Sequence, residues 1–201
     1  FDYIICRGLL YNREGSFSDY FRGIKTMTGK VFLMNILVGA ITVALLTLAA
    51  LASGAGFLLF SDYAIKDTKI VISLIVLFTL VMIFTSLIFA YLNFFMADER
   101  YRDLPFFDSL KLILKAGIKL FSESFMAGVK AYKITLLTGV IALVTGILSM
   151  KAPAAAVFAI IFGVIAAIAL FLCTPPFRAS LSDIYMDRAE EIYNEVMGCE
   201  D

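Results

Sequence analysis

Long stretches without a charged residue alternate along this chain with segments in which charged and polar residues are frequent. Four such uncharged runs cover residues 31–61, 70–97, 134–150 and 152–177. A helix needs about 20 apolar residues to cross the ~30 Å hydrocarbon core of a bilayer. The apolar residues are continuous rather than alternating with polar ones, which argues against the strands of a membrane β-barrel. The pattern predicts an all-α, polytopic helical membrane protein with transmembrane helices at about 31–54, 72–97, 131–150 and 153–176.

Two of the runs differ in length from a single crossing. The third is short and reaches the required length, as residues 130–150, only if the side chains of Tyr132 and Lys133 extend to the membrane surface from its entry end. A re-entrant third segment is the alternative. The first run is longer than one crossing requires, and we expect residues 53–56, Ser-Gly-Ala-Gly, to end or loosen its helix.

Three polar segments carry apolar residues at helical spacing. They predict interfacial helices at about 16–29 and 106–128 and a C-terminal amphipathic helix at about 178–197. The first of these is expected to anchor the chain at the membrane surface, with partner docking as the alternative. Pro175 and Pro176 are expected to kink the chain where the fourth span ends, because proline removes a helical hydrogen bond and restricts the residue before it.

The predicted helix at 106–128 carries lysines at every fourth position. We expect an apolar stripe that includes Leu114 and Ile118 to lie in the membrane interface, with the lysines on the opposite flank. Each lysine near an anionic leaflet contributes about 1 kcal/mol, so a general affinity for anionic lipids is expected. A specific lipid-headgroup site is the sharper alternative, and its residues would be Lys111, Lys115 and Lys119.

The C-terminal helix has an acidic face. Because this helix and the lysine-bearing one are attached to spans at the same membrane face, we expect them to lie side by side, with Asp183 or Asp187 nearest the lysines. A cluster of carboxylates can also bind a divalent ion, but acids at this spacing on a helix in water are usually solvated. No metal site is therefore predicted.

The composition excludes several classes of protein and of functional site. Of 201 residues, 61% are hydrophobic and 17% are charged, and the mean hydropathy is +0.92, whereas soluble domains carry about 25% charged residues. The chain has 17 basic and 17 acidic residues, which gives no reason to expect a nucleic-acid partner, and its lack of histidine excludes Ser-His-Asp triads and histidine-ligated zinc. Apart from Lys133 at the start of the third, the spans hold no Asp, Glu, Lys or Arg, unlike ion-coupled transporters. We predict no catalytic, cofactor-binding or metal-binding residues.

The basic residues are distributed unevenly between the loops. Of the 17 Lys and Arg residues, 14 lie in residues 1–30, 98–133 and 178–201. By the positive-inside rule, we predict a multi-pass protein of the plasma membrane in which residues 1–30, 98–130 and 178–201 are cytoplasmic. We also expect Cys6 and Cys199 to be accessible free thiols on that side, and Cys173 to be screened by lipid or neighbouring helices.

Small residues in the last two spans indicate close packing between helices. They are Gly139, Ala142, Gly146, Gly163 and Ala167.

The order of these features resembles the DUF975 and YciC-like group of bacterial and archaeal membrane proteins, which is related to the membrane domain of some glycerophosphodiester phosphodiesterases. The resemblance rests on three motifs. The first is carried by Phe17, Asp19, Phe21, Gly23 and Lys25, the second by residues 97–98 and 109–111, and the last by Pro176, Phe177, Tyr185 and Asp187. It implies about six spans, of which one or two would precede Phe1, and it implies no catalytic residue.

These observations lead to one preferred function and one alternative. We predict a single transmembrane helical domain over residues 1–201 that acts as a non-enzymatic accessory or assembly component of a membrane complex. Its partners would be the bilayer, anionic lipids at the cytoplasmic face, and another membrane protein or a second copy of the chain. The alternative is a lipid-handling protein or transporter subunit with a basic cytoplasmic face.

Overall fold

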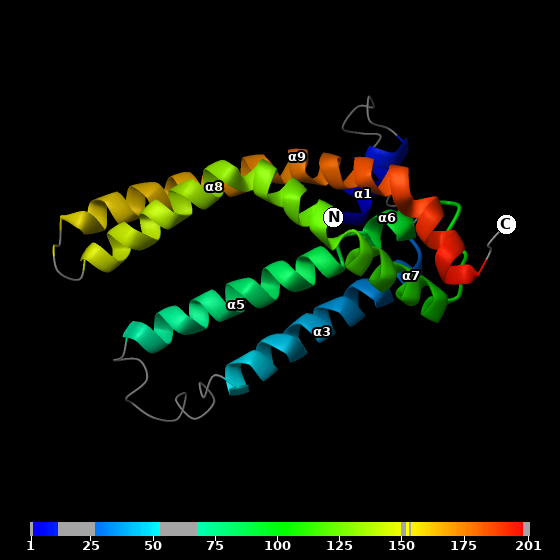
Figure 1. The fold of residues 1–201 in the computed structure, drawn as a ribbon, viewed down its shortest axis with the longest axis horizontal. Helices are drawn as coiled ribbons and strands as arrows, with labels where there is room; N and C mark the ends of the chain where they lie inside the picture. Colours follow the sequence, from blue (N-terminus) through cyan, green and yellow to red (C-terminus); the bar gives the residue numbers. More distant parts are fainter. Residues whose placement is uncertain (1, 12–26, 53–67, 150–151, 153, 199–201) are drawn as a thin grey trace. The chain divides into compact units, whose positions relative to one another are not determined.

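The computed structural model describes residues 2–11, 27–52, 68–149, 152 and 154–198. Every regular element in these ranges is a helix (Figure 1). The helices are α1 (Asp2–Tyr11), α3 (Gly29–Ala52), α5 (Thr68–Ile88), α6 (Leu92–Ala97), α7 (Phe106–Lys119), α8 (Phe121–Ser149) and α9 (Ala155–Met197). Four segments are long and apolar enough to cross a membrane, and they begin at Gly29, Val76, Phe121 and Ala155. The predicted fold class is confirmed, since the chain is an all-α helical membrane protein.

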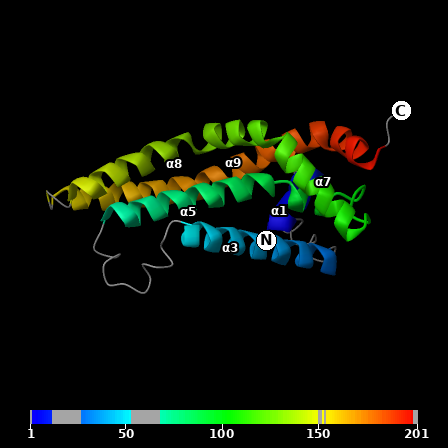
Figure 2. The same cartoon turned by 60° about the horizontal axis from the view of Figure 1, so that its bottom comes forward.

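The helices form two units, which are described separately. The first comprises Phe1–Phe121 with Ala189–Asp201, and the second comprises Ser122–Arg188. In the first unit, α3 and α5 lie side by side, as the two views in Figures 1 and 2 show. The short helix α6 contacts α1, α3 and α7, and α7 also contacts the end of α5. This unit therefore has a helical core built around α6.

Helix α6 is buried on every side. All six of its residues are buried, as is Tyr91 immediately before it. A helix that faced a core on one side only would leave part of its surface exposed. Cys6 from α1 and Leu112 from α7 are also fully buried in this unit. Burying a large apolar side chain contributes about 1.5–3 kcal/mol, so this core is the main source of stability in the first unit.

The second predicted span is interrupted. It was expected to be one helix over 72–97, but α5 ends at Ile88 and residues 89–91 form a turn before α6. In that turn the Leu92 N–H donates to the Phe89 carbonyl oxygen at 3.1 Å, three residues back. The backbone of Gly117 on α7 packs directly against the Ile88 carbonyl. The change of direction follows from tertiary contact, because the run itself contains no proline, glycine or charge.

Two further predicted boundaries are wrong. The interfacial helix expected at 106–128 ends at Lys119, and α8 begins at Phe121, so one helix includes both the end of that segment and the third span. Helix α9 likewise continues through Pro175 and Pro176, whereas a separate C-terminal helix was expected to begin near residue 178, and the expected kink stays a prediction. Each proline removes one hydrogen bond, which weakens a long apolar helix without necessarily ending it.

Some predictions fall on other parts of the chain. The interfacial helix at 16–29 lies mostly outside the described residues, except that α3 begins at Gly29. The expected break at residues 53–56 also lies outside them.

The second unit is a pair of neighbouring helices, α8 and the larger part of α9, which lie side by side in Figures 1 and 2. The rings of Tyr132 and Phe177 are 5.2 Å apart, and the Tyr132 hydroxyl donates to Thr174 Oγ1 at 3.3 Å. The expected close packing is not found at Gly139, Gly146 and Gly163, because a Cβ atom built at any of them meets nothing within 4 Å.

Candidate functional site

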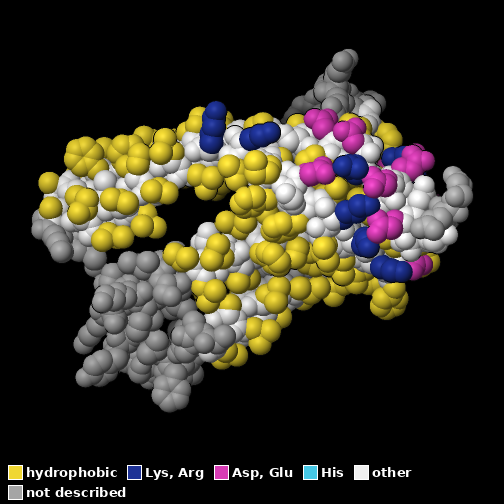
Figure 3. Space-filling view, viewed as in Figure 1, with side chains coloured by type: hydrophobic (Ala, Val, Ile, Leu, Met, Phe, Trp, Pro, Cys, Tyr) yellow, Lys and Arg dark blue, Asp and Glu magenta, His cyan; other side chains and the backbone are white. Residues whose placement is uncertain are grey.

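Charged side chains of the first unit gather over α7 and the last turns of α9, whereas apolar side chains cover α3 and α5 (Figure 3). We call this cluster the charged cap. It is built by residues from three distant parts of the chain. The cap residues are Arg7, Tyr11, Asp98, Glu99, Arg100, Lys115, Lys119, Glu190, Glu191 and Glu195.

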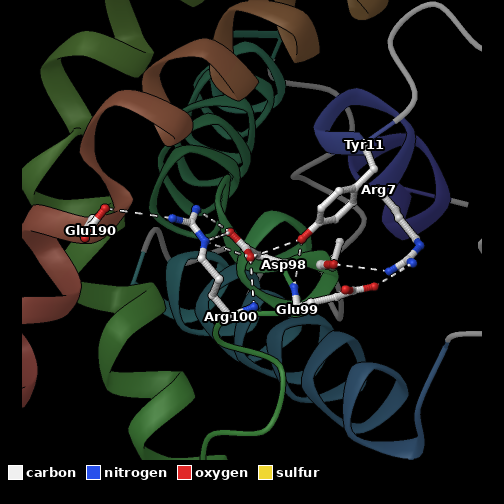
Figure 4. A network of polar contacts seen from close by, with 7 residues as sticks. Arg7, Tyr11, Asp98, Glu99, Arg100 and Glu190 are labelled. Carbon is white, nitrogen blue, oxygen red and sulfur yellow. Dashed lines mark hydrogen bonds and ion pairs between the residues drawn. The ribbon is translucent and has the colours of Figure 1, made fainter.

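Asp98, at the C-terminal end of α6, is the centre of the cap (Figure 4). Its side chain is 3% exposed. Arg100 donates to both carboxylate oxygens, from Nη2 to Oδ2 at 2.8 Å and from Nε to Oδ1 at 3.2 Å. The Arg100 backbone N–H also donates to Oδ1 at 3.0 Å. A buried carboxylate requires such donors, and the paired guanidinium geometry fixes the loop that follows α6.

Helix α1 supplies the next set of contacts. The Tyr11 hydroxyl donates to Asp98 Oδ1 at 3.3 Å and accepts the Glu99 backbone N–H at 3.0 Å. Arg7 Nη2 lies 3.1 Å from Glu99 Oε1, and Nη1 donates to the Ala97 carbonyl oxygen at 3.5 Å. Partial burial raises the pKa of Tyr11, with a smaller opposing effect from the Glu99 N–H. The phenol therefore stays protonated and able to donate to Asp98.

Tyr101 connects the loop to the end of α9. Its ring lies 5.0 Å from the Tyr193 ring, and the Arg100 guanidinium stands 5.1 Å above it. Arg100 Nη1 is also 4.0 Å from Glu190 Oε2. Burial raises the pKa of Tyr101, while the Arg100 cation opposes that shift. The last turns of α9 are thus held against the loop by aromatic as well as charged contacts.

Two of the three predicted lipid-binding lysines pair with α9. Lys115 Nζ lies 2.8 Å from Glu195 Oε1, and Lys119 Nζ lies 2.6 Å from Glu195 Oε2 and 3.0 Å from Glu191 Oε1. These pairs hold the pKa of Glu195 at about 2 and raise the pKa of Lys119. The basic helix and the end of α9 lie side by side as expected, but the predicted partners Asp183 and Asp187 are wrong for these two lysines.

The third lysine, Lys111, lies on an exposed face of α7. It lies four residues after Phe107 and seven before Ile118, which places the three on neighbouring positions of one helix face. Phe107 is 79% exposed and Ile118 is 65% exposed. The buried face of α7 is formed by Leu112, Ile113 and Ala116 among others, so the predicted apolar stripe is divided into a buried face and an exposed one.

The expected accessibility of one thiol, that of Cys6, is wrong. Cys6 was expected to be accessible from the cytoplasmic side, but it is fully buried in the first unit. Cys173 is half-buried, and Cys199 lies outside the described residues. The apolar residues of α1 pack against α6 instead of presenting Cys6 to solvent.

Sequence reasoning missed the central residues of the cap. Asp98, Tyr11 and Arg100 were assigned to loops and helix ends, with no role beyond their charge. One signal for these residues was available in the sequence. A long apolar run ends at Ala97, and acidic and basic residues follow it directly at positions 98–100. The long-range partner on α1 could not be found from spacing, since Tyr11 and Asp98 are 87 positions apart.

The charged cap can hold helices together, because its acidic side chains form ion pairs with basic side chains. Among the described residues, no group of three or more Cys, Asp or Glu side chains is placed to hold a metal ion. Glu191 and Glu195 accept lysine ammonium groups, and Asp98 accepts a guanidinium. The arrangement is suited to fixing three segments at one end of α3 and α5.

Comparisons with protein-family models, with characterised proteins and with solved structures found no match to this chain. The resemblance to the DUF975 and YciC-like group stays a prediction.

Proposed function

We propose that this chain is a non-enzymatic membrane protein that acts as an accessory or assembly component of a membrane complex. The observation that carries the proposal is the space beside the glycines of α8 and α9. Gly139, Gly146 and Gly163 have nothing within 4 Å of a built Cβ. Helices in a bilayer associate mainly where small residues let their backbones approach, so these positions suit a helix from another protein or a second copy.

Two further observations support the proposal. Apolar side chains are exposed along the same helices, including Leu137, Ile160 and Phe171. The charged cap binds its own acids and bases to one another, which supports a structural role for these groups. Its pairs are used for holding α1, α7 and the end of α9 in place.

The test is a substitution that fills the space without disturbing the chain. In membranes that contain the full chain with an affinity tag, Gly163→Leu should reduce recovery of the associated protein or second copy about tenfold after extraction in mild detergent. The matched control is Val164→Leu, one position away on α9 and already exposed. A wild-type rate of modification at Cys173, which is half-buried in α9 of the same unit, would show that both variants are folded. Equal recovery from Gly163→Leu and wild type would contradict the proposal.

We also propose that the cap faces the cytoplasm of the plasma membrane. The cap joins residues from all three segments that the positive-inside rule assigns to that side, which supports their lying on one side. An impermeant maleimide should label Ala152→Cys in intact cells, because Ala152 is exposed between α8 and α9. It should label Glu190→Cys only after permeabilisation. The reverse pattern would invert the orientation.

A further inference from the structure

A groove with a volume of about 730 Å³ lies within the second unit, between the first turns of α8 and the part of α9 that follows its prolines. Its walls are both charged and apolar. The residues that matter for its chemistry are Glu123, Met126, Lys130, Ala131, Pro176 and Asp183. Such a surface suits a ligand that has charged and apolar parts.

The groove lies where the two helices change from charged to apolar. The uncharged part of α8 begins at Ile134, just after Lys130, and the uncharged part of α9 ends at Phe177, next to Pro176. The rings of Tyr132 and Phe177, which contact one another at a tilt, lie at the same level. Aromatic residues are enriched at this depth, where lipid headgroups meet the hydrocarbon. The molecules that surround the groove in a membrane are therefore phospholipids.

The charges in the groove have a definite order. Lys130 lies toward the apolar part of α8, and Glu123 lies seven residues farther out, which corresponds to about 10 Å along a helix. On α9, Asp183 likewise lies seven residues beyond Pro176. A cation thus stands nearest the membrane and two carboxylates stand beyond it. A zwitterionic phospholipid carries the complementary order, with phosphate next to glycerol and an ammonium group beyond the phosphate.

We propose that this groove binds a phospholipid whose headgroup ends in a primary ammonium, as in phosphatidylethanolamine. Lys130 contacts the phosphate, and Asp183 and Glu123 receive the ammonium. A primary ammonium donates hydrogen bonds to carboxylates, whereas a quaternary ammonium has no N–H to donate. The charged residues that line the groove are two acids and one base, so an anionic headgroup without an amine should be retained less well.

Arg188 adds a constraint at the outer end of the groove. Its Nη2 lies 3.4 Å from Glu123 Oε1, and both side chains are roughly half exposed. The ammonium therefore shares the Glu123 carboxylate with Arg188.

The test measures lipid retention by the full chain in mild detergent, using native mass spectrometry. Phosphatidylethanolamine, phosphatidylcholine and phosphatidylglycerol with identical acyl chains are offered separately. Wild type should retain phosphatidylethanolamine about tenfold better than either of the others. Lys130→Gln should lower that retention about tenfold. Asp183→Asn should remove the preference over phosphatidylcholine.

The matched control is Lys133→Gln, which changes an exposed lysine on the same helix that does not line the groove. Its lipid retention should equal that of wild type. A wild-type rate of modification at Cys173, which is half-buried in the same unit, confirms folding of each variant. Equal retention of all three lipids by wild type would overturn the proposal, as would unchanged retention in Lys130→Gln. Lys130-dependent preference for phosphatidylglycerol would also overturn it, because the groove would then select an anionic headgroup.

Discussion

The two units of this protein are stabilised in different ways. In the first, a six-residue helix is enclosed on every side, and a glycine on α7 brings two backbones into contact. In the second, no part of the most apolar stretch of α8 or α9 is buried inside the chain. Side chains such as Tyr132 and Phe177 make contacts between these helices.

The difference shows that one membrane protein can combine two kinds of packing. The first unit is a close-packed core, in which a change of one methyl group alters the free energy of unfolding. The second unit leaves room beside its glycines, so its helices depend more on lipid or on another helix for contact. Substitutions of the same kind should therefore have unequal effects in the two units.

The largest expected effect comes from Gly117→Ala. The added Cβ would overlap the carbonyl of Ile88, and backbone on both sides leaves no flexible side chain to move. We expect a destabilisation of about 3 kcal/mol. The measurement is thermal unfolding in detergent, followed with a thiol-reactive dye that reports exposure of Cys6 in a chain with Cys173→Ala and Cys199→Ser.

A glycine-to-alanine substitution in the second unit serves as the control for Gly117→Ala. Gly139→Ala meets nothing within 4 Å and should be neutral or stabilising by up to about 1 kcal/mol, since alanine favours helix more than glycine does. If Gly139→Ala destabilised the chain as much as Gly117→Ala, the contrast between the units would be wrong.

The next effect concerns the buried carboxylate of the cap. Asp98→Ala removes the acceptor for Arg100 and for the Tyr11 hydroxyl, and we expect a loss of about 2 kcal/mol. The same thermal assay measures it. Asp103→Ala is the matched control in the same loop, because the Asp103 side chain is 89% exposed and should contribute less than about 0.5 kcal/mol.

The sequence predicted those features that depend on one local property. Uncharged runs specify the membrane-crossing helices, because lipid excludes charge regardless of the fold. The turn at residues 89–91 was missed because it depends on Gly117, which is remote in sequence from Ile88. The break after Lys119 was missed because the apolar pattern continues across it.

The partners of the lysines were missed for a related reason. Acidic residues occur along the whole predicted C-terminal helix, so charge alone did not specify which of its turns meets the lysines. Within the first unit, Glu191 and Glu195 in the last turns of α9 make these contacts. Both pairs of residues have the same four-residue spacing, so they match along the two helices.

The two cysteines in the described part of the chain provide a smaller, kinetic comparison. Cys6 is fully buried in the first unit and Cys173 is half-buried in α9. In the folded protein, membrane-permeant N-ethylmaleimide should modify Cys173 about tenfold faster than Cys6, because local opening must precede reaction at a buried site. Peptide mass spectrometry measures both rates. Equal rates would indicate that α1 is not held against α6.

The smallest effect is expected at the exposed pairs of the cap. The pKa of Glu195 is lowered to about 2, so its contribution is present above the ordinary carboxylate value of about 4.3 and is lost as pH falls through about 2. The pKa of Lys119 is raised, so its contribution is present below its ordinary pKa and is lost as pH rises through the raised value. The contact should be unchanged between about pH 5 and pH 10.

A double-mutant cycle tests this contact. Lys119→Gln and Glu195→Gln should show a coupling at low salt that disappears at about 1 M salt, since exposed charges are screened. The control pairs Lys111→Gln with Glu195→Gln, because Lys111 has no ion pair with Glu195. Coupling that persists at high salt would contradict an exposed electrostatic contact.

The position of the last turns of α9 has a consequence for biosynthesis. Glu191 lies 72 residues after Lys119, so the ribosome adds it roughly 4–14 s later at ~5–20 residues per second. During that interval the nascent first unit lacks the segment that covers Tyr101 and neutralises Lys115 and Lys119. Completion of the first unit therefore waits until the last turns of α9 have been synthesised, and a chain terminated before them would present an unfinished surface to quality-control proteases.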